Sequence, residues 1–322
     1  MKVKIGEISI FLPATTEGAD ALQAANPDWD IPKILEKTGV ITRHIADPEQ
    51  TAADLAFEAG RKLLSQIGSP GTIDLLLLVT QSPDYILPTT ACILQDRLGL
   101  PKNCMAFDIN LGCSGFVYAL SVAGSLIESG TARRAVILCA ETYSRYIGPN
   151  DRTCRPIFSD GAAAILVEPS AKDQIGPFDF GTDGSGYDRL IVRDGGARQL
   201  AAQAHARACL EMQGSDVFLF TMKVVPESVR KVLGRAEVPI EQIDLFVFHQ
   251  ASKLVIDSLV RRLALDEHKV FTNYQSIGNT VSATIPIALK DASDQGRLRA
   301  GQTVLVVGFG VGLSWGASLI RW

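Results

Sequence analysis

The feature that most constrains the fold of this chain is an internal repeat. Three stretches of the first half, each rich in aliphatic residues, recur in the same order in the second half. The matching pairs are residues 73–81 with 243–250, 134–140 with 302–308 and 161–167 with 316–322. One such match could be the similarity of two generic strands, but three matches in the same order indicate two related halves. We therefore expect a pseudo-duplicated chain, divided into halves at residues 1–170 and 171–322.

Each half alternates between two kinds of segment. Short aliphatic runs such as residues 73–80 and 134–140 suit strands that are buried on both faces. Between them lie longer stretches of helical periodicity, for example residues 51–68 and 115–130. This alternation predicts an α/β fold in which helices cover buried sheets. We interpret the Gly- and Asp-rich segment 176–214 as a mostly surface connection that carries one helix or strand.

Composition excludes several classes of protein. Hydrophobic residues make up 47% of the 322 and the formal net charge is −4, so the chain resembles neither a disordered protein nor a basic nucleic-acid-binding one. No apolar run approaches the ~20 residues of a membrane span. The six cysteines form no C-x-x-C pair, which argues against a zinc or thioredoxin-type site. We expect a cytoplasmic enzyme with reduced thiols, no nucleic-acid partner, no membrane span and no metal.

Cys113 is the sharpest chemical signal. It follows a predicted strand at residues 104–109 and precedes an apolar helix at residues 115–130. A thiol at a strand-to-helix turn lies at the positive end of the helix dipole, which lowers its pKa and favours the thiolate. Its small neighbours, two glycines and a serine, would let a substrate carbonyl approach the sulfur. The local motif also allows a buried structural cysteine.

Two further residues fit a site with Cys113. His249 ends an aliphatic run, which places it at the carboxyl edge of a sheet, where α/β proteins collect their functional residues. Asn279 follows a glycine at the start of a helix rich in small residues. The structural alternatives are that His249 is a hydrogen-bonded histidine of the core and that Asn279 caps a helix. A Cys, a His and an Asn at element edges and far apart in sequence nevertheless match a site assembled in space.

At these residues the chain resembles β-ketoacyl-[acyl-carrier-protein] synthase III, a family of the thiolase-like superfamily. The stretches that carry the resemblance run from near the N-terminus to the last residues. They are residues 38–46, 110–116, 151–152, 158–162, 249–251, 278–280 and 315–317. The resemblance implies a thiolase-like α/β fold, in which two βαβαβ-type halves pack as five alternating layers.

The resemblance also implies a two-stage mechanism. Cys113 would take up an acyl group from a thioester, and malonyl-acyl carrier protein would then lose carbon dioxide and attack the acyl-enzyme. His249 and Asn279 would donate hydrogen bonds to the enolate oxygen, while backbone N–H groups of Cys113 and of the glycine loop 308–312 would form a second oxyanion hole. The implied partners are an acyl-CoA or acyl-carrier-protein donor, a malonyl thioester, the acyl carrier protein itself and a second copy in a homodimer. No cofactor beyond the phosphopantetheine thioesters is implied.

The resemblance implies a set of substrate-binding residues as well: Lys33, Lys37, Leu87, Arg152, Ser252, Phe309 and Val311. Lys33 and Lys37 stand where many members of the family have a tryptophan and an arginine that clamp the adenine of CoA. Lysine can pair with phosphate but cannot stack on adenine, so either CoA or a carrier protein can be the donor. Leu87 matches the position that reaches across the dimer into the neighbour's acyl channel. Val311 replaces a loop glycine beside the acyl pocket.

Two alternatives within the fold stay open. One is an acyltransferase that passes its acyl group to an oxygen or nitrogen nucleophile without losing carbon dioxide, and the other is an inactive partner subunit. Related thiolases carry a second cysteine in the C-terminal glycine loop, and hydroxymethylglutaryl-CoA synthases carry a glutamate base near residues 80–82. This chain has neither, and Asp84 is the carboxylate nearest to that stretch in sequence. These features favour decarboxylative condensation, in fatty-acid initiation or a related specialised pathway.

Overall fold

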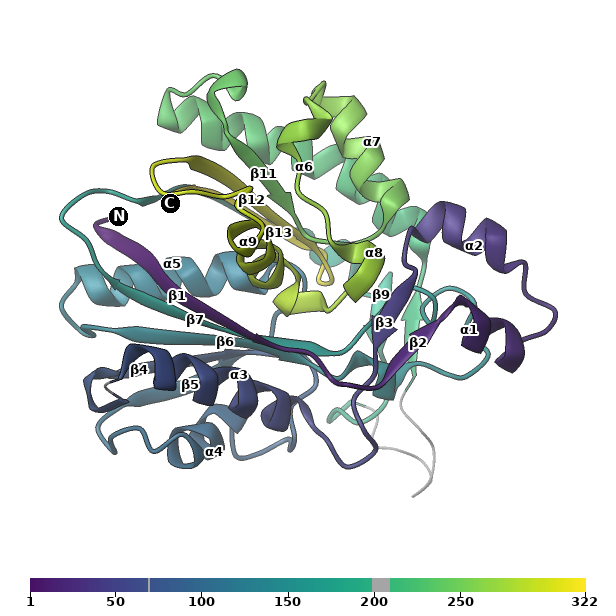
Figure 1. Cartoon of the computed structure of the whole chain (residues 1–322), viewed down its shortest axis with the longest axis horizontal. Coiled ribbons are helices and arrows are strands. Elements are labelled where there is room, and N and C mark those ends of the chain that lie inside the picture. The colour runs from purple at the N-terminus through teal and green to yellow at the C-terminus, as the bar shows by residue number, and fades with distance from the viewer. Residues whose placement is uncertain (69, 199–208) are drawn as a thin grey trace.

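The computed structural model of the chain describes residues 1–68, 70–198 and 209–322. Its first half is built on five strands, which are β1 (Val3–Phe11), β4 (Leu75–Val79), β5 (Met105–Ile109), β6 (Ala135–Glu141) and β7 (Gly161–Pro169). They form one sheet in the order β1-β7-β6-β4-β5 (Figure 1). The pairs β4–β5 and β4–β6 are parallel, whereas β6–β7 and β7–β1 are antiparallel.

The second half is built on β8 (Ile175–Thr182), β11 (Leu245–Phe248), β12 (Thr303–Gly310) and β13 (Ser314–Arg321). Their order is β11-β12-β13-β8, with a parallel first pair and two antiparallel pairs, as in β4-β6-β7-β1. The counterpart of β5 is reduced to a parallel bridge between Phe246 and Val270. The two sheets therefore share one connectivity, in agreement with the internal repeat. We propose that the boundary between the two halves lies between residues 170 and 171.

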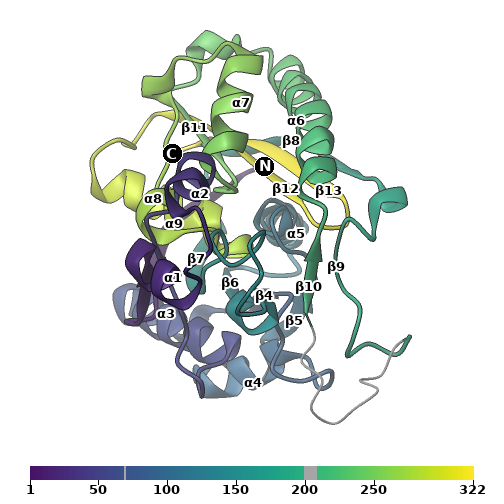
Figure 2. The ribbon, with the colours of Figure 1, turned by 90° about the vertical axis from the view of Figure 1, so that its right-hand side faces the viewer.

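Helices separate and cover the two sheets (Figures 1 and 2). The pair α5 (Gly115–Glu128) and α9 (Thr284–Asp294) lies between the sheets, α3 (Ala52–Ile67) and α4 (Thr90–Arg97) cover the first sheet, and α6 (Gly214–Ala236) and α7 (Lys253–Leu263) cover the second. The apolar core follows these layers. One central cluster joins both sheets to α5 and α9, and a further cluster lies beneath each outer helix pair. The predicted five-layer α/β fold is confirmed.

The local sequence explains how individual elements form. The helix α3 begins after Thr51, which forms a capping box with Asp54, and ends at Gly68, whose φ of 66° is the left-handed conformation that glycine adopts easily. The strand β4 consists of four leucines and a valine, all buried, because it has a strand on each side and helices on both faces. Within the described ranges, no helix is long and apolar enough to cross a membrane.

Smaller elements gather at the right-hand end of the sheets in Figure 1. They are α1 (Ala19–Ala25), α2 (Ile31–Thr38), α8 (Tyr274–Ile277), β2 (Thr16–Gly18), β3 (Thr42–His44), β9 (Leu190–Val192) and β10 (Leu210–Met212). Short 3-10 helices lie at Pro70–Thr72, Tyr143–Tyr146, Gly184–Gly186, Ile240–Gln242, Glu267–Lys269 and Val281–Ala283. The pairs β2–β3 and β9–β10 are both antiparallel.

The segment 176–214 holds more strands than we expected. It contains most of β8, which forms an edge of the second sheet, and the β9–β10 pair, while its residues 199–208 lie outside the described part of the chain. The prediction of a single helix or strand is wrong. Only Ile175 and Asp179 of β8 are buried, and Pro177 and two glycines interrupt its pattern, so this strand carries no clear alternation of apolar residues.

Candidate active site

A cavity of about 460 Å³ is lined by the side chains of Cys113, His249 and Asn279 together. Each of these residues is almost completely buried, with exposed fractions of 4%, 2% and 4%. Cys113 comes from the turn between β5 and α5, His249 directly follows β11, and Asn279 comes from the turn between α8 and α9. The structure thus brings together, from both halves of the chain, the three residues that the sequence singled out.

The C-terminal end of β12 packs directly against Cys113. A Cβ atom placed on Gly310 would lie 2.8 Å from the Cys113 sulfur, and one on Gly308 would lie 2.6 Å from its carbonyl oxygen. These two glycines are therefore required for the close approach of the two backbones. The hydroxyl of Ser114 lies 2.8 Å from that of Ser314, which donates in turn to the Val311 carbonyl. These contacts fix the position of the turn that carries the sulfur.

The sequence led us to expect a thiol with a lowered pKa, and the structure corrects this. Burial raises the pKa of the Cys113 thiol to about 12, and the carboxyl of Glu141 adds to the rise. Hydrogen bonds from the backbone N–H groups of Val311 and Cys113 act in the opposite direction but are outweighed. The thiol is therefore protonated at neutral pH, because loss of water around the sulfur outweighs the two backbone hydrogen bonds.

His249 is held as a neutral imidazole. Burial lowers its pKa to about 3, so the ring carries no charge at neutral pH. Its Nδ1 atom lies 2.7 Å from Oγ1 of Thr284, the first residue of α9. The ring of Phe309 meets the imidazole edge to face, with 5.5 Å between ring centroids. These contacts orient the other nitrogen, Nε2, toward Asn279, whose Nδ2 atom is 3.4 Å away.

Asn279 is fixed through both its backbone and its side chain. Its N–H donates to the Ile157 carbonyl and its own carbonyl accepts from Ser159 N–H, each at 2.9 Å. The side-chain Oδ1 accepts from the Val281 N–H, also at 2.9 Å. Because Oδ1 is engaged in this way, the NH₂ end of the amide faces His249. The pair can therefore present nitrogen donors to a substrate oxygen.

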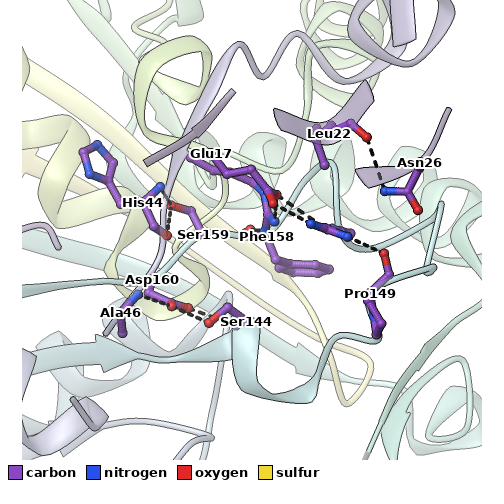
Figure 3. Close-up of polar contacts among 12 residues, drawn as sticks. Glu17, Leu22, Asn26, His44, Ala46, Ser144, Pro149, Phe158, Ser159 and Asp160 are labelled. Carbon is purple, nitrogen blue, oxygen red and sulfur yellow. Dashed lines mark hydrogen bonds and ion pairs between the residues drawn. The ribbon is translucent and has the colours of Figure 1, made fainter. Parts of the chain in front are cut away.

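A polar network outside the cavity fixes the segment that pairs with Asn279 (Figure 3). Arg43 donates to the Phe158 carbonyl at 2.8 Å and forms an ion pair with Glu17. Glu17 also accepts from Arg155 Nη2 at 2.6 Å. Phe158 forms the parallel bridge with Asn279, so the ion-paired cluster of Glu17, Arg43 and Arg155 bears on the position of the amide.

The predicted substrate-binding residues divide into two groups. Those that line the cavity are Lys37, Arg152, Ser252 and Phe309, and those that do not are Lys33, Leu87 and Val311. Val311 borders a separate cavity of about 280 Å³ with Gln81 and Tyr143. Leu87 is 79% exposed, so it faces away from the site of its own chain. The Arg152 guanidinium lies 5.9 Å from the centre of the Trp29 ring.

Glu141 is a residue that sequence reasoning missed. Its buried carboxylate accepts from Gln81 N–H at 3.0 Å and from the Ser82 hydroxyl at 2.8 Å. Burial raises its pKa to about 8. Asp84, the nearest carboxylate in sequence, instead accepts from Thr51 at the start of α3. Because β4 and β6 run parallel side by side, Glu141 at the end of β6 meets the residues just after β4, and this adjacency is the signal that could have revealed it.

Two family models match the chain. The model of 3-oxoacyl-[acyl-carrier-protein (ACP)] synthase III matches residues 107–184, and that of the C-terminal part of 3-oxoacyl-[acyl-carrier-protein (ACP)] synthase III matches residues 233–322. Cys113 falls within the first match, and both His249 and Asn279 fall within the second. The matched segments thus contain all three residues that meet in the cavity.

Similar proteins cover nearly the whole chain. A β-ketoacyl-[acyl-carrier-protein] synthase III of Clostridium perfringens strain SM101 is 41% identical over an alignment of 332 positions, gaps included, which covers 99% of this chain and 98% of that protein. A crystal structure of a 3-oxoacyl-(acyl-carrier-protein) synthase III superposes with a TM-score of 0.96 at 42% identity and covers 100% of both chains. The corresponding synthase of Pseudomonas aeruginosa PAO1 gives a TM-score of 0.91 at 33% identity, over 100% of this chain and 98% of that one.

Proposed function

Because the chain belongs to the β-ketoacyl-[acyl-carrier-protein] synthase III family, we propose that Cys113 carries the acyl group in its reaction. The chain is an acyltransferase that condenses an acyl thioester with malonyl-acyl carrier protein, as in the initiation of fatty-acid synthesis. The observation that supports the residue assignment is the meeting of Cys113, His249 and Asn279 in one cavity.

The first stage transfers an acyl group to Cys113. The sulfur forms a bond to the carbonyl carbon of the incoming thioester, and the bond from that carbon to the donor sulfur breaks. The thiol proton leaves the protein as the donor departs as a free thiol. Because burial raises the pKa of Cys113 to about 12, proton loss must accompany attack rather than precede it. The backbone N–H groups of Cys113 and Val311 would stabilise the oxyanion of the tetrahedral intermediate.

The second stage forms the new carbon–carbon bond. The malonyl group loses carbon dioxide, and the electron pair of the broken bond passes into the thioester as an enolate. The enolate carbon attacks the acyl group on Cys113, the carbon–sulfur bond breaks, and the sulfur takes up a proton from water. His249 Nε2 and Asn279 Nδ2 would donate to the enolate oxygen, and one such donor is worth roughly 2.7–4 kcal/mol. No carboxylate base is needed, since departure of carbon dioxide itself generates the carbanion.

The mouth of the cavity fits a phosphopantetheine arm. Lys37 and Arg152 supply positive charge there, and Ser252 supplies a hydroxyl. Trp29 is 8% exposed and packs against Leu22, so little of its ring is free to stack on an adenine. We therefore propose that the donor is recognised mainly through its phosphopantetheine, on either CoA or a carrier protein.

The remaining proposals concern the oligomeric state, the location and the cofactors of the enzyme. The apolar side chains of Tyr85, Ile86 and Leu87 are 61%, 84% and 79% exposed, and β5 has an open edge. We propose that these groups are covered in a homodimer, in which Leu87 reaches toward the neighbour's acyl channel. We also propose a cytoplasmic location and a reaction that uses no cofactor beyond the thioester substrates.

A two-step assay tests the assignment. The enzyme is incubated with acyl-CoA or acyl-acyl carrier protein, and intact mass is used to locate an adduct on Cys113. Malonyl-acyl carrier protein is then added and carbon dioxide is measured. We expect an adduct with wild type and none with Cys113→Ala. His249→Ala should form the adduct but release carbon dioxide at least roughly 10²-fold more slowly. If His249→Ala lost acylation and decarboxylation equally, the role given to His249 would be wrong.

A further inference from the structure

Thr284 contacts the one nitrogen of His249 that does not face Asn279. Its Oγ1 atom lies 2.7 Å from His249 Nδ1, and each of the two residues is only 2% exposed. Thr284 starts α9, the central helix of the second half, and therefore sits on a rigid element. The imidazole is thus held between a hydroxyl at Nδ1 and a carboxamide near Nε2.

The hydroxyl of Thr284 has one proton and two neighbouring acceptors. They are His249 Nδ1 at 2.7 Å and the Val281 carbonyl at 3.0 Å. The Val281 carbonyl already accepts the backbone N–H of Thr284. The hydroxyl can donate to Nδ1, or it can donate to the Val281 carbonyl and accept from a protonated Nδ1, and in each arrangement all of these groups have a partner. The contact on the other side of the ring, between Nε2 and Asn279, therefore distinguishes the two arrangements.

This choice determines where the imidazole carries its own proton. A neutral imidazole whose Nδ1 accepts a hydrogen bond has its proton on Nε2. The adjacent Asn279 Nδ2 is also a donor, because its Oδ1 is occupied by Val281 N–H. The 3.4 Å between Nε2 and Nδ2 is long for a hydrogen bond and suits two donors that lie side by side. Both residues line the cavity, so both N–H groups are available to a substrate oxygen.

We propose that Thr284 is a positioning residue that keeps the proton of His249 on Nε2. The proposal rests on the proposed function, in which that N–H donates to the enolate oxygen. Without the hydroxyl, the tautomer with its proton on Nε2 loses the donor that supports its bare Nδ1. In the other tautomer, a bare Nε2 lone pair would then face the enolate oxygen and repel it. Loss of Thr284 should therefore impair decarboxylation and spare acyl transfer to Cys113.

Three variants separate this role from a purely structural one. Thr284→Val removes the hydroxyl and keeps the shape of the side chain, while Thr284→Ser restores the hydroxyl. Thr280→Val is the matched control, because Thr280 is fully buried four residues earlier and its hydroxyl has no partner among the described residues. We expect Thr284→Val to release carbon dioxide from malonyl-acyl carrier protein roughly 10- to 100-fold more slowly, with the loss in kcat rather than KM. Thr284→Ser should recover most of this rate, and Thr280→Val should match wild type.

Nitrogen NMR of protein labelled with ¹⁵N-histidine tests the tautomer without reference to activity. The His249 signals are assigned by their loss in His249→Ala. We expect wild type to show a protonated Nε2 and a bare Nδ1, and Thr284→Val to show a mixture. A wild-type signal with its proton on Nδ1, or an unchanged tautomer and decarboxylation rate in Thr284→Val, would overturn the proposal. If His249→Ala decarboxylated normally while the Thr284→Val tautomer changed, the proposed function would fail and the role of Thr284 would stand.

Discussion

The sulfur of Cys113 lies against the backbone of Gly310, so close that a Cβ on residue 310 would come within 2.8 Å of it. Gly310 also has a φ of 155°, a conformation that residues with a side chain rarely adopt. Two independent constraints, the close approach and the positive φ, thus require glycine beside Cys113. The C-terminal end of β12 forms one wall of the site and limits the position of the sulfur.

Gly310→Ala should therefore damage acyl transfer and stability together. The added methyl group must displace either the sulfur or the loop, and overpacking of this kind costs about 1–3 kcal/mol. We expect intact-mass time courses to show much slower adduct formation, and urea unfolding to show a lower free energy. Gly234→Ala in α6 is the control, because nothing lies within 4 Å of its added Cβ. A Gly310→Ala enzyme that acylates at the wild-type rate would contradict this account.

The reactivity of Cys113 toward a small alkylating agent should rise steadily with pH. Burial raises the pKa of its thiol to about 12, so the thiolate fraction grows about tenfold for each pH unit below that value. We expect inactivation by iodoacetamide to accelerate from pH 7 to pH 10 without levelling off. The measurement is the rate of mass increase on Cys113, with Cys113→Ala to identify labelling elsewhere. A plateau near pH 8 would show a much more acidic thiol.

Glu141 should make stability fall as the pH rises above 6.5. Burial raises its pKa from 4.5 to about 8, so between these values the folded protein binds a proton that the unfolded chain has lost. Stability therefore declines with pH in this window, by up to about 1.4 kcal/mol per unit. His249, with a pKa lowered from 6.5 to about 3, has the opposite effect but only below pH 6.5.

The window from pH 6.5 to 8 isolates the contribution of Glu141. We expect the unfolding free energy of wild type, measured in urea, to decline across it. Glu141→Gln removes the titrating group, so its unfolding free energy should vary less over the same range. Equal slopes for the two proteins would mean that Glu141 stays ionised in the folded state.

Arg152 should contribute to binding more than to turnover. It lines the cavity together with Lys37, both side chains are exposed, and its guanidinium lies over Trp29. Removal of hydrogen bonds to a charged phosphate costs about 1.5–3 kcal/mol, so Arg152→Ala should raise KM for the acyl donor roughly tenfold or more at a similar kcat. Arg133→Ala, at an exposed residue paired with Asp74, is the control. A drop in kcat with no change in KM would remove Arg152 from the binding site.

Most of the fold could be predicted from the sequence because its strongest signals are local. The aliphatic run of β4 and the helical periodicity of α3 and α5 are set by burial on defined faces, which composition and spacing reveal. The strand β8 carries no such signal, since only two of its residues are buried. The meeting of Cys113, His249 and Asn279 could be anticipated because each ends or begins an element.

What could not be predicted depends on tertiary neighbours. Glu141 and Gln81 meet only because β4 and β6 pair in parallel, and sequence distance hides this. Thr284 looks like any threonine at a helix start until His249 is placed beside it. The pKa of Cys113 was misjudged for the same reason, because the helix terminus is visible in the sequence whereas the depth of burial is not.

The shared connectivity of the two sheets has a consequence for the origin of the chemistry. Cys113 lies two residues before α5, and Asn279 lies five residues before α9, which is the matching central helix of the other half. Duplication of an ancestral unit would have placed two copies of the turn before the central helix on opposite sides of one cavity. In the proposed reaction, one copy of that turn supplies the attacking sulfur and the other supplies the amide donor. The first half supplies Cys113 and the second supplies His249 and Asn279, so neither half alone contains the complete site.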